Sequence, residues 1–175
     1  MIYQQNQPLR IAVIDMYEGV DNQGMRCIRE LLNQFAEIQG RDLIREEFDV
    51  RRTSIMPDMS YDIYLCSGGP GSPIDSKGTD WENAYFLWIK KTLNYNADES
   101  HTIKKSVLFI CHSFQLACRY FNVAEVSKRK TTAFGVFPVH YLTDAGSDPI
   151  FGGLNDPFYA VVCRDYTVLE LDPYS

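Results

Sequence analysis

The sequence predicts a three-layer α/β domain with a mostly parallel central sheet. Over the first two thirds of the chain, short apolar runs rich in β-branched residues alternate with longer stretches in which apolar residues recur every three or four positions. Strands that alternate with helices in this order form parallel sheets that are covered by helices on both faces. The 175 residues contain no internal repeat, low-complexity tract or linker, so we expect one domain over residues 1–175.

Three segments read as strands of such a sheet, and the first has the composition of a strand buried on both faces. They read Leu-Arg-Ile-Ala-Val-Ile-Asp-Met at residues 9–16, Tyr-Asp-Ile-Tyr-Leu-Cys-Ser at 61–67 and Ser-Val-Leu-Phe-Ile-Cys at 106–111. Residues 46–52 instead alternate apolar with charged side chains. That pattern predicts a strand nearer the edge of the sheet.

Three further segments have the periodicity of amphipathic helices. Residues 22–39 are followed by Gly40, which suits a C-cap, and residues 80–95 begin beside side chains that suit an N-cap. Residues 113–121 follow the strand at 106–111 with almost no connecting segment. We therefore expect a very tight turn between that strand and its helix.

The last third of the chain has a different character. Residues 134–142 and 158–162 read as strands, and the segment between them is rich in the turn formers Asp, Gly and Pro. We expect this part of the chain to be antiparallel or irregular.

Charge and composition exclude several classes of function. The 17 basic and 23 acidic residues give a formal net charge of -6, and the basic residues are scattered, so no nucleic-acid partner is expected. The start of the chain lacks the features of a signal peptide, and no apolar run reaches the length of a membrane span, which predicts a cytoplasmic protein without a membrane partner. The five cysteines include no Cys-x-x-Cys pair and indicate reduced thiols, with neither a metal site nor a cofactor.

A glycine-rich loop follows the strand predicted at residues 61–67. Residues 67–73 read Ser-Gly-Gly-Pro-Gly-Ser-Pro and lie at the carboxyl end of a strand, where ligands of open α/β sheets bind. Glycines let such a loop turn sharply and present bare backbone N–H groups to a ligand. The alternative is a plain surface turn. The loop lacks the Lys and Ser or Thr of a phosphate-binding P-loop, so no nucleotide is implied.

A cysteine occupies the tight turn between the strand predicted at residues 106–111 and its helix. Residues 109–115 read Phe-Ile-Cys-His-Ser-Phe-Gln, which places Cys111 where a nucleophile elbow lifts its reactive atom out of the sheet. The N-terminus of a helix favours the thiolate, which is the form that attacks a carbonyl carbon. The alternative is that Cys111 is a small buried hydrophobic residue.

Together and in this order, the glycine-rich loop and the cysteine elbow resemble the two signature segments of the class I glutamine amidotransferases. Residues 135–139, 148–154 and 158–168 also resemble downstream segments of that family. The resemblance implies a flavodoxin-like fold and hydrolysis of L-glutamine through a cysteine γ-glutamyl thioester. It also implies that the released ammonia passes to a synthetase domain or subunit, as in a GMP synthase-like enzyme.

The resemblance assigns roles to individual residues. Cys111 is the nucleophile, and the backbone N–H groups of Gly69 and His112 form the oxyanion hole. None of these roles requires a metal or a cofactor. The residues implied in substrate binding are Gly71, Gln115, Asp165 and Tyr166.

The chain departs from the family at three places. Phe109 and Ser113 replace the glycines of the family's Gly-x-Cys-x-Gly-x-Gln elbow, and residues 163–165 read Cys-Arg-Asp where many relatives carry a His-Ser-Asp-like run. The family's His-x-Glu motif, which supplies the general base, does not follow Cys111. We therefore expect a domain that is truncated at its C-terminus.

The three histidines in the chain are poor substitutes for that general base. His101 lies in a polar segment and is expected at the surface, and His140 is expected on a strand. The side chain of His112 should diverge from that of its neighbour Cys111, because adjacent side chains on an elbow point in different directions.

Two other functions stay open. One is a catalytically inactive amidotransferase-like module that binds a partner or a glutamine-like metabolite. The other is a DJ-1-like thiol hydrolase or redox sensor, for which an acid such as Glu18 would have to lie beside Cys111.

Overall fold

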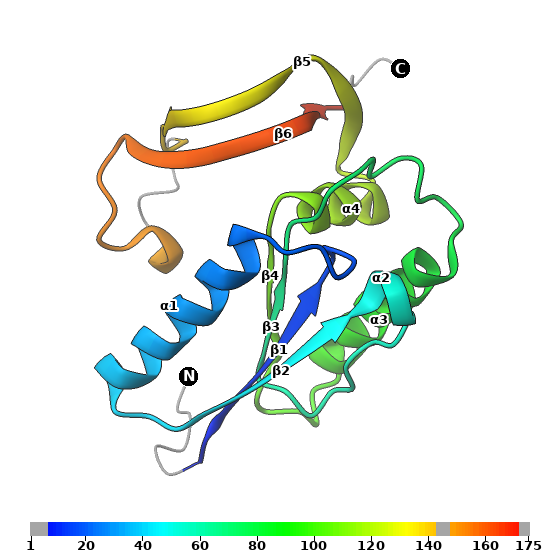
Figure 1. Cartoon of the computed structure of the whole chain (residues 1–175). Coiled ribbons are helices and arrows are strands. Elements are labelled where there is room, and N and C mark those ends of the chain that lie inside the picture. Colours follow the sequence, from blue (N-terminus) through cyan, green and yellow to red (C-terminus); the bar gives the residue numbers. More distant parts are fainter. Residues whose placement is uncertain (1–6, 143–147, 172–175) are drawn as a thin grey trace. The chain divides into compact units, whose positions relative to one another are not determined.

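The structure is a computed structural model that describes residues 7–142 and 148–171 (Figure 1). It divides into two compact units. Of the described residues, 7–126 with 168–171 form the first unit, and 127–142 with 148–167 form the second. No helix within the described residues is both long enough and apolar enough to cross a membrane.

The described part of the first unit contains a parallel sheet of four strands. β1 (Leu9–Asp15) lies between β2 (Leu43–Asp49) and β3 (Ile63–Cys66), and β3 pairs in turn with β4 (Ser106–Phe109). The strand order β2-β1-β3-β4 is that of flavodoxin-like sheets. β2 lies at an edge of the sheet, as its alternating sequence predicts.

Helices cover both faces of this sheet (Figure 1). α1 (Gln23–Gln39) packs with β1 in a smaller core cluster, and α3 (Asp80–Ala97) and α4 (His112–Phe121) contribute to a larger core cluster with the sheet. The predicted three-layer α/β fold is therefore confirmed. The buried residues of the smaller cluster are Leu9, Ile11, Val13, Met25 and Leu32, and those of the larger cluster include Ile14, Tyr64, Tyr85, Trp88 and Leu116.

Local sequence explains where the long helices begin and end. Asn22 caps α1, because its side-chain oxygen accepts a hydrogen bond of 2.7 Å from the backbone N–H of Met25. Gly40 ends the helix in the left-handed conformation, with a φ of 57°. Thr79 caps α3 in the same way as Asn22 caps α1. These boundaries agree with the predicted ones.

The strand predicted over residues 46–52 is wrong at both ends. β2 begins earlier, at Leu43, and its last residue is Asp49. The side chain of Asp49 then accepts a hydrogen bond from the backbone N–H of Arg52, and the chain turns into the short helix α2 (Val50–Thr53). A capping side chain therefore overrides the alternation of apolar and charged residues on which the prediction rests.

The second unit holds most of a two-stranded sheet. Its strands are β5 (Ala124–Val139), which begins in the first unit, and β6 (Phe158–Glu170), which ends there. One hydrogen bond joins Thr132 to Asp165, which are 33 residues apart, and another joins Tyr141 to Asp156, which are 15 residues apart. The separation shrinks as one segment runs forward and the other backward, which is the pattern of an antiparallel pair. Both strands are longer than the predicted ones.

Loss of side-chain volume from the larger core cluster should destabilise the fold. Ile14 is fully buried there, so Ile14→Ala should lower the free energy of unfolding by about 3 kcal/mol. Ile38 on α1 is 78% exposed, and Ile38→Ala should change that free energy by less than about 0.5 kcal/mol. Urea denaturation of both variants measures the difference. Equal losses would show that this cluster does not stabilise the sheet.

Candidate active site

Only two residues connect β4, which ends at Phe109, to α4, which begins at His112. One of them, Cys111, has a φ of 54° and a ψ of -103°, a conformation that residues other than glycine rarely adopt. Cys111 is exposed and occupies the N-cap position of α4. A strained and exposed cysteine between a strand and a helix has the geometry of a nucleophile elbow.

Ser113 holds this turn together. Its buried hydroxyl donates to the backbone carbonyl of Cys66 at the end of β3 (2.8 Å) and accepts from the backbone N–H of Ile110 (2.8 Å). The same N–H of Ile110 also donates to the carbonyl of Cys66 (3.0 Å). The serine that replaces a glycine of the family's elbow therefore ties the turn to the neighbouring strand.

Phe109, the other departure from the family's elbow, is accommodated by packing. It pairs in register with Cys66 of β3, and its side chain packs against the larger core cluster. The turn at Cys111 therefore forms without glycine at position 109.

The glycine-rich loop lies against the elbow. A Cβ atom added at Gly68 would lie 3.4 Å from the Cβ of Cys111 and 3.2 Å from the hydroxyl oxygen of Tyr17. A Cβ atom added at Gly69 would collide with the backbone carbonyl of Met16. Glycine at these two positions therefore lets the loop approach both Cys111 and the segment that follows β1.

The other residues implied in substrate binding lie in both units. Gly71 has a φ of 85°, and Gln115 is buried in the first turn of α4. Asp165 lies on β6 in the second unit, where its carboxylate accepts a hydrogen bond of 2.5 Å from the hydroxyl of Thr132, and Tyr166 is the next residue. Their roles in binding stay predictions.

Arg51 of α2 connects three parts of the fold near the glycine-rich loop. Its guanidinium donates to the backbone carbonyls of Met16 (3.1 Å) and Pro70 (2.7 Å). It also lies 3.3 Å from the carboxylate of Glu18 and 5.2 Å from the centre of the Trp81 ring. Glu18, the acid considered for a DJ-1-like site, is therefore paired with Arg51. No sequence pattern indicated the role of this arginine.

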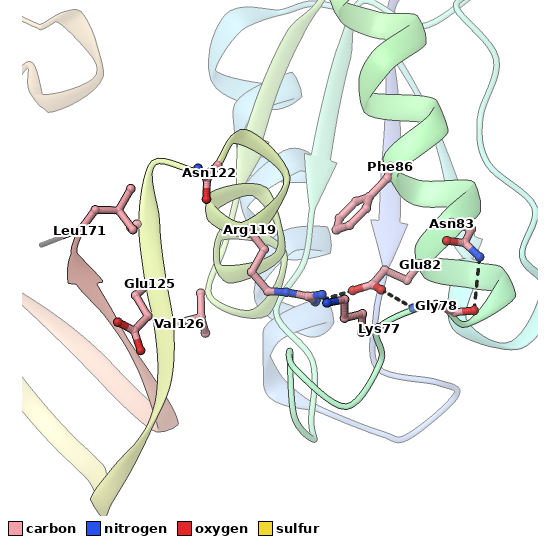
Figure 2. Close-up of a pocket in the computed structure, with 11 residues that line it drawn as sticks. Lys77, Gly78, Glu82, Asn83, Phe86, Arg119, Asn122, Glu125, Val126 and Leu171 are labelled. Atoms are coloured by element: carbon pink, nitrogen blue, oxygen red, sulfur yellow. Dashed lines mark hydrogen bonds and ion pairs between the residues drawn. The ribbon is translucent and has the colours of Figure 1, made fainter. Parts of the chain in front are cut away.

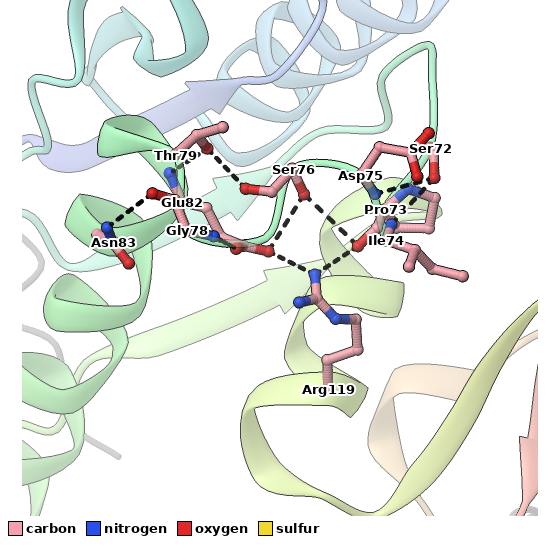
Figure 3. A network of polar contacts seen from close by, with 10 residues as sticks. All are labelled: Ser72, Pro73, Ile74, Asp75, Ser76, Gly78, Thr79, Glu82, Asn83 and Arg119. Atoms are coloured by element: carbon pink, nitrogen blue, oxygen red, sulfur yellow. Dashed lines mark hydrogen bonds and ion pairs between the residues drawn. The ribbon is translucent and has the colours of Figure 1, made fainter.

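A buried ion pair holds the end of the same loop. Glu82 of α3 is 1% exposed and pairs with Arg119 of α4 (Figure 2). The Glu82 carboxylate also accepts from the hydroxyl of Ser76 (3.1 Å) and the backbone N–H of Gly78 (2.9 Å), while Arg119 donates to the carbonyl of Pro73 (Figure 3). One network therefore joins α3, α4 and the chain that leaves the glycine-rich loop.

A pocket of about 630 Å³ lies beside this ion pair (Figure 2). Its lining includes Lys77, Asn83, Phe86 and Asn122. No residue of the glycine-rich loop or of the elbow contributes to the lining. The pocket is therefore separate from Cys111, and we assign no substrate to it.

His112 follows Cys111 in sequence, but its side chain lies in the interior. It is 2% exposed, its ring centre lies 6.4 Å from that of Trp81, and its Nε2 atom has no hydrogen-bond partner among the described residues. Burial, followed by the positive charges of Arg51 and Arg119, lowers the pKa of His112 to about 4. The imidazole is therefore neutral at pH 7 and faces the interior, whereas Cys111 is exposed.

The other two histidines make contacts elsewhere in the chain. The ring of His101 stacks on Tyr95 with 3.7 Å between ring centres. His140 lies 3.6 Å from the carboxylate of Asp156 in the second unit. Across residues 7–142 and 148–171, no group of three or more His, Cys, Asp or Glu side chains is arranged to hold a metal ion.

Solved structures share this fold. The chain matches the crystal structure of a glutamine amidotransferase from Thermotoga maritima with a TM-score of 0.69, at 16% sequence identity over 94% of this chain and 64% of that one. It matches the crystal structure of a glutamine amidotransferase from Methylobacillus flagellatus with a TM-score of 0.57, at 15% identity over 92% of this chain and 56% of that one. The chain has a glutamine amidotransferase-like fold.

This glutamine amidotransferase-like chain spans less than two thirds of the length of either solved structure. No protein-family model matches its sequence, and no curated protein matches it either. At identities of 15% and 16%, the likeness establishes the fold alone.

Removal of the cation from the buried ion pair should destabilise the first unit. Arg119→Met leaves the Glu82 carboxylate buried without its partner and should lower the free energy of unfolding by about 3 kcal/mol. Adding Glu82→Gln to that variant should recover part of the loss, because the unpaired charge is then gone. Arg26→Met, at an exposed position on α1, is the matched control in urea denaturation. A loss below about 1 kcal/mol for Arg119→Met would contradict this assignment.

The buried His112 should make the fold less stable in mild acid. Its pKa is about 4 in the folded chain and about 6.5 in the unfolded chain, so between these values only the unfolded chain binds the proton. The free energy of unfolding should therefore fall as the pH falls from about 6.5 to 4, by about 3 kcal/mol at most. His112→Gln removes this contribution, and its urea midpoint should decline less between pH 7 and pH 4.5. Parallel declines in the two proteins would contradict a neutral, buried His112.

Proposed function

We propose that this chain hydrolyses L-glutamine as a class I glutamine amidotransferase domain, with Cys111 as the nucleophile. The observation that carries the proposal is the positive φ of the exposed Cys111, at the N-terminus of α4 and against Gly68. Backbone strain of this kind costs about 1–3 kcal/mol and clusters at active sites. The glutamine amidotransferase-like fold supports the same function.

In the proposed reaction, the Cys111 thiolate attacks the side-chain amide carbon of glutamine. A C–S bond forms while the carbonyl π electrons move onto oxygen, and this oxyanion accepts hydrogen bonds from the backbone N–H groups of Gly69 and His112. Collapse of the intermediate breaks the C–N bond, and the nitrogen leaves as ammonia after it takes up a proton. Water then hydrolyses the thioester, which yields glutamate and restores the thiol.

Proton transfer is the step for which the chain has no assigned residue. No His-x-Glu motif follows Cys111, and the side chain of His112 is buried and neutral at pH 7. We therefore propose that rapid turnover requires a histidine and an acid in addition to those of this chain. The 175-residue chain alone should form a covalent adduct but turn over glutamine poorly.

The remaining assignments extend the same proposal. The substrate contacts come from Gly71, Gln115, Asp165 and Tyr166. The released ammonia passes to a synthetase domain or subunit. The sequence resemblance favours a GMP synthase-like enzyme as this acceptor. A cytoplasmic location fits the five cysteines, all of which are free thiols.

A glutamine-like chloroketone tests the nucleophile directly. The reagent should alkylate Cys111 in the 175-residue chain, as read by peptide mass spectrometry, and excess L-glutamine should slow the labelling. Cys111→Ala should abolish the labelling because it removes the attacking sulfur. Cys27→Ala removes another exposed thiol, on α1, and should leave the labelling unchanged.

Several other outcomes would contradict parts of this function. Labelling that spreads over the exposed cysteines, or that glutamine does not slow, would contradict a glutamine site at Cys111. Glutamine binding without alkylation would indicate a binding module, and selective peroxide oxidation of Cys111 without either would favour a DJ-1-like redox sensor. Robust steady-state release of ammonia by this chain would show that it contains its own general base.

A further inference from the structure

Tyr17 lies in the loop between β1 and α1, and both local and core contacts hold it there. Its backbone N–H donates to the carboxylate of Asp15 (2.8 Å), and its carbonyl accepts from the N–H of Val20 (3.0 Å). The half-buried ring packs against the smaller core cluster, which includes Met25. The position of the phenol is therefore set by the loop and the core together.

Two glycines make room for the Tyr17 hydroxyl. A Cβ atom added at Gly24 would overlap the hydroxyl oxygen, and one added at Gly68 would lie 3.2 Å from it. Neither glycine has a φ in the left-handed region, so the backbone conformation does not require glycine at either position. Glycine also lowers the stability of a helix relative to alanine, and Gly24 lies in the first turn of α1. The Tyr17 hydroxyl occupies the space that a side chain at position 24 would need, which accounts for glycine there.

Gly68 also borders the side chain of Cys111. The same added Cβ atom would lie 3.4 Å from the Cβ of Cys111. The Tyr17 hydroxyl and the Cys111 side chain therefore flank one glycine, although they come from loops that follow different strands. A phenol O–H is a hydrogen-bond donor, and hydrogen bonds to an ionised acceptor such as a thiolate are stronger than those between neutral groups.

We propose that the Tyr17 hydroxyl donates a hydrogen bond to the Cys111 thiolate and orients the sulfur for attack. The attack on glutamine rests on the proposed function, whereas stabilisation of the thiolate is a property of this chain alone. A hydrogen bond to the ionised form favours that form, so loss of the hydroxyl should make the thiol harder to ionise.

The pH profile of alkylation by iodoacetamide measures this effect in the 175-residue chain. Tyr17→Phe keeps the ring but removes the donor, and it should move the midpoint for the Cys111 peptide upward by about one pH unit, which slows alkylation at pH 7 by up to about tenfold. The other charged or titratable groups of the surrounding loops are unchanged in this variant. They include Asp15, Glu18, Asp21, Arg51, Arg52 and His112.

A matched control separates this role from the general effect of removing a tyrosine hydroxyl. The hydroxyl of Tyr64 donates to the carbonyl of Asp58. Asp58 precedes β3, whereas the glycine-rich loop beside Cys111 follows it. Tyr64→Phe should therefore leave the midpoint for Cys111 unchanged. Urea denaturation of each variant checks that it is folded under the conditions of the assay.

A second variant displaces the hydroxyl without removing it. Gly24→Ala adds a methyl group where the hydroxyl oxygen now lies, and it should move the midpoint in the same direction as Tyr17→Phe. An unchanged midpoint in both folded variants would overturn the role of Tyr17. Failure of the parent chain to react with the glutamine-like chloroketone would instead refute the glutaminase function, and the midpoint shift would still be present.

Discussion

The geometry of the site depends on one strained residue. Cys111 adopts a φ of 54° between β4 and α4, at a cost of about 1–3 kcal/mol. Hydrogen bonds from Ser113 and Ile110 to the carbonyl of Cys66 offset that cost. Because these bonds end on β3, the turn keeps its shape only while β3 and β4 keep the register that pairs Cys66 with Phe109. The parallel sheet thus presents the sulfur at its carboxyl edge, where α4 begins.

Two arginines hold the glycine-rich loop beside this turn. Arg51 binds the carbonyl of Pro70, and Arg119 binds the carbonyl of Pro73, so the loop is attached to α2 at one point and to α4 at another. Both cations also help to keep His112 neutral. No buried imidazolium therefore lies next to Cys111. If Cys111 ionises, its thiolate is stabilised by the N-terminus of α4 and by the hydrogen-bond donors around it.

Features set by local sequence could be predicted, and features set by packing could not. The strands and helices of the first unit, the C-cap of α1 at Gly40 and the tight turn at Cys111 follow from patterns that each lie within one segment. The end of β2 could not be predicted because the Asp49 cap competes with a strand-like alternation. The contacts of Arg51 and Tyr17 arise only when loops after different strands converge. The role of Asp165 stays a prediction, because it lies in the second unit.

We propose that the glycine-rich loop and the start of α4 form an oxyanion site for a substrate bound to Cys111. A crystal structure of the chain after reaction with the glutamine-like chloroketone tests it most directly. The reagent's carbonyl oxygen should accept hydrogen bonds from the backbone N–H groups of Gly69 and His112, at about 2.7–3.1 Å. An adduct on another cysteine, or one whose oxygen points into solvent away from both N–H groups, would contradict the claim.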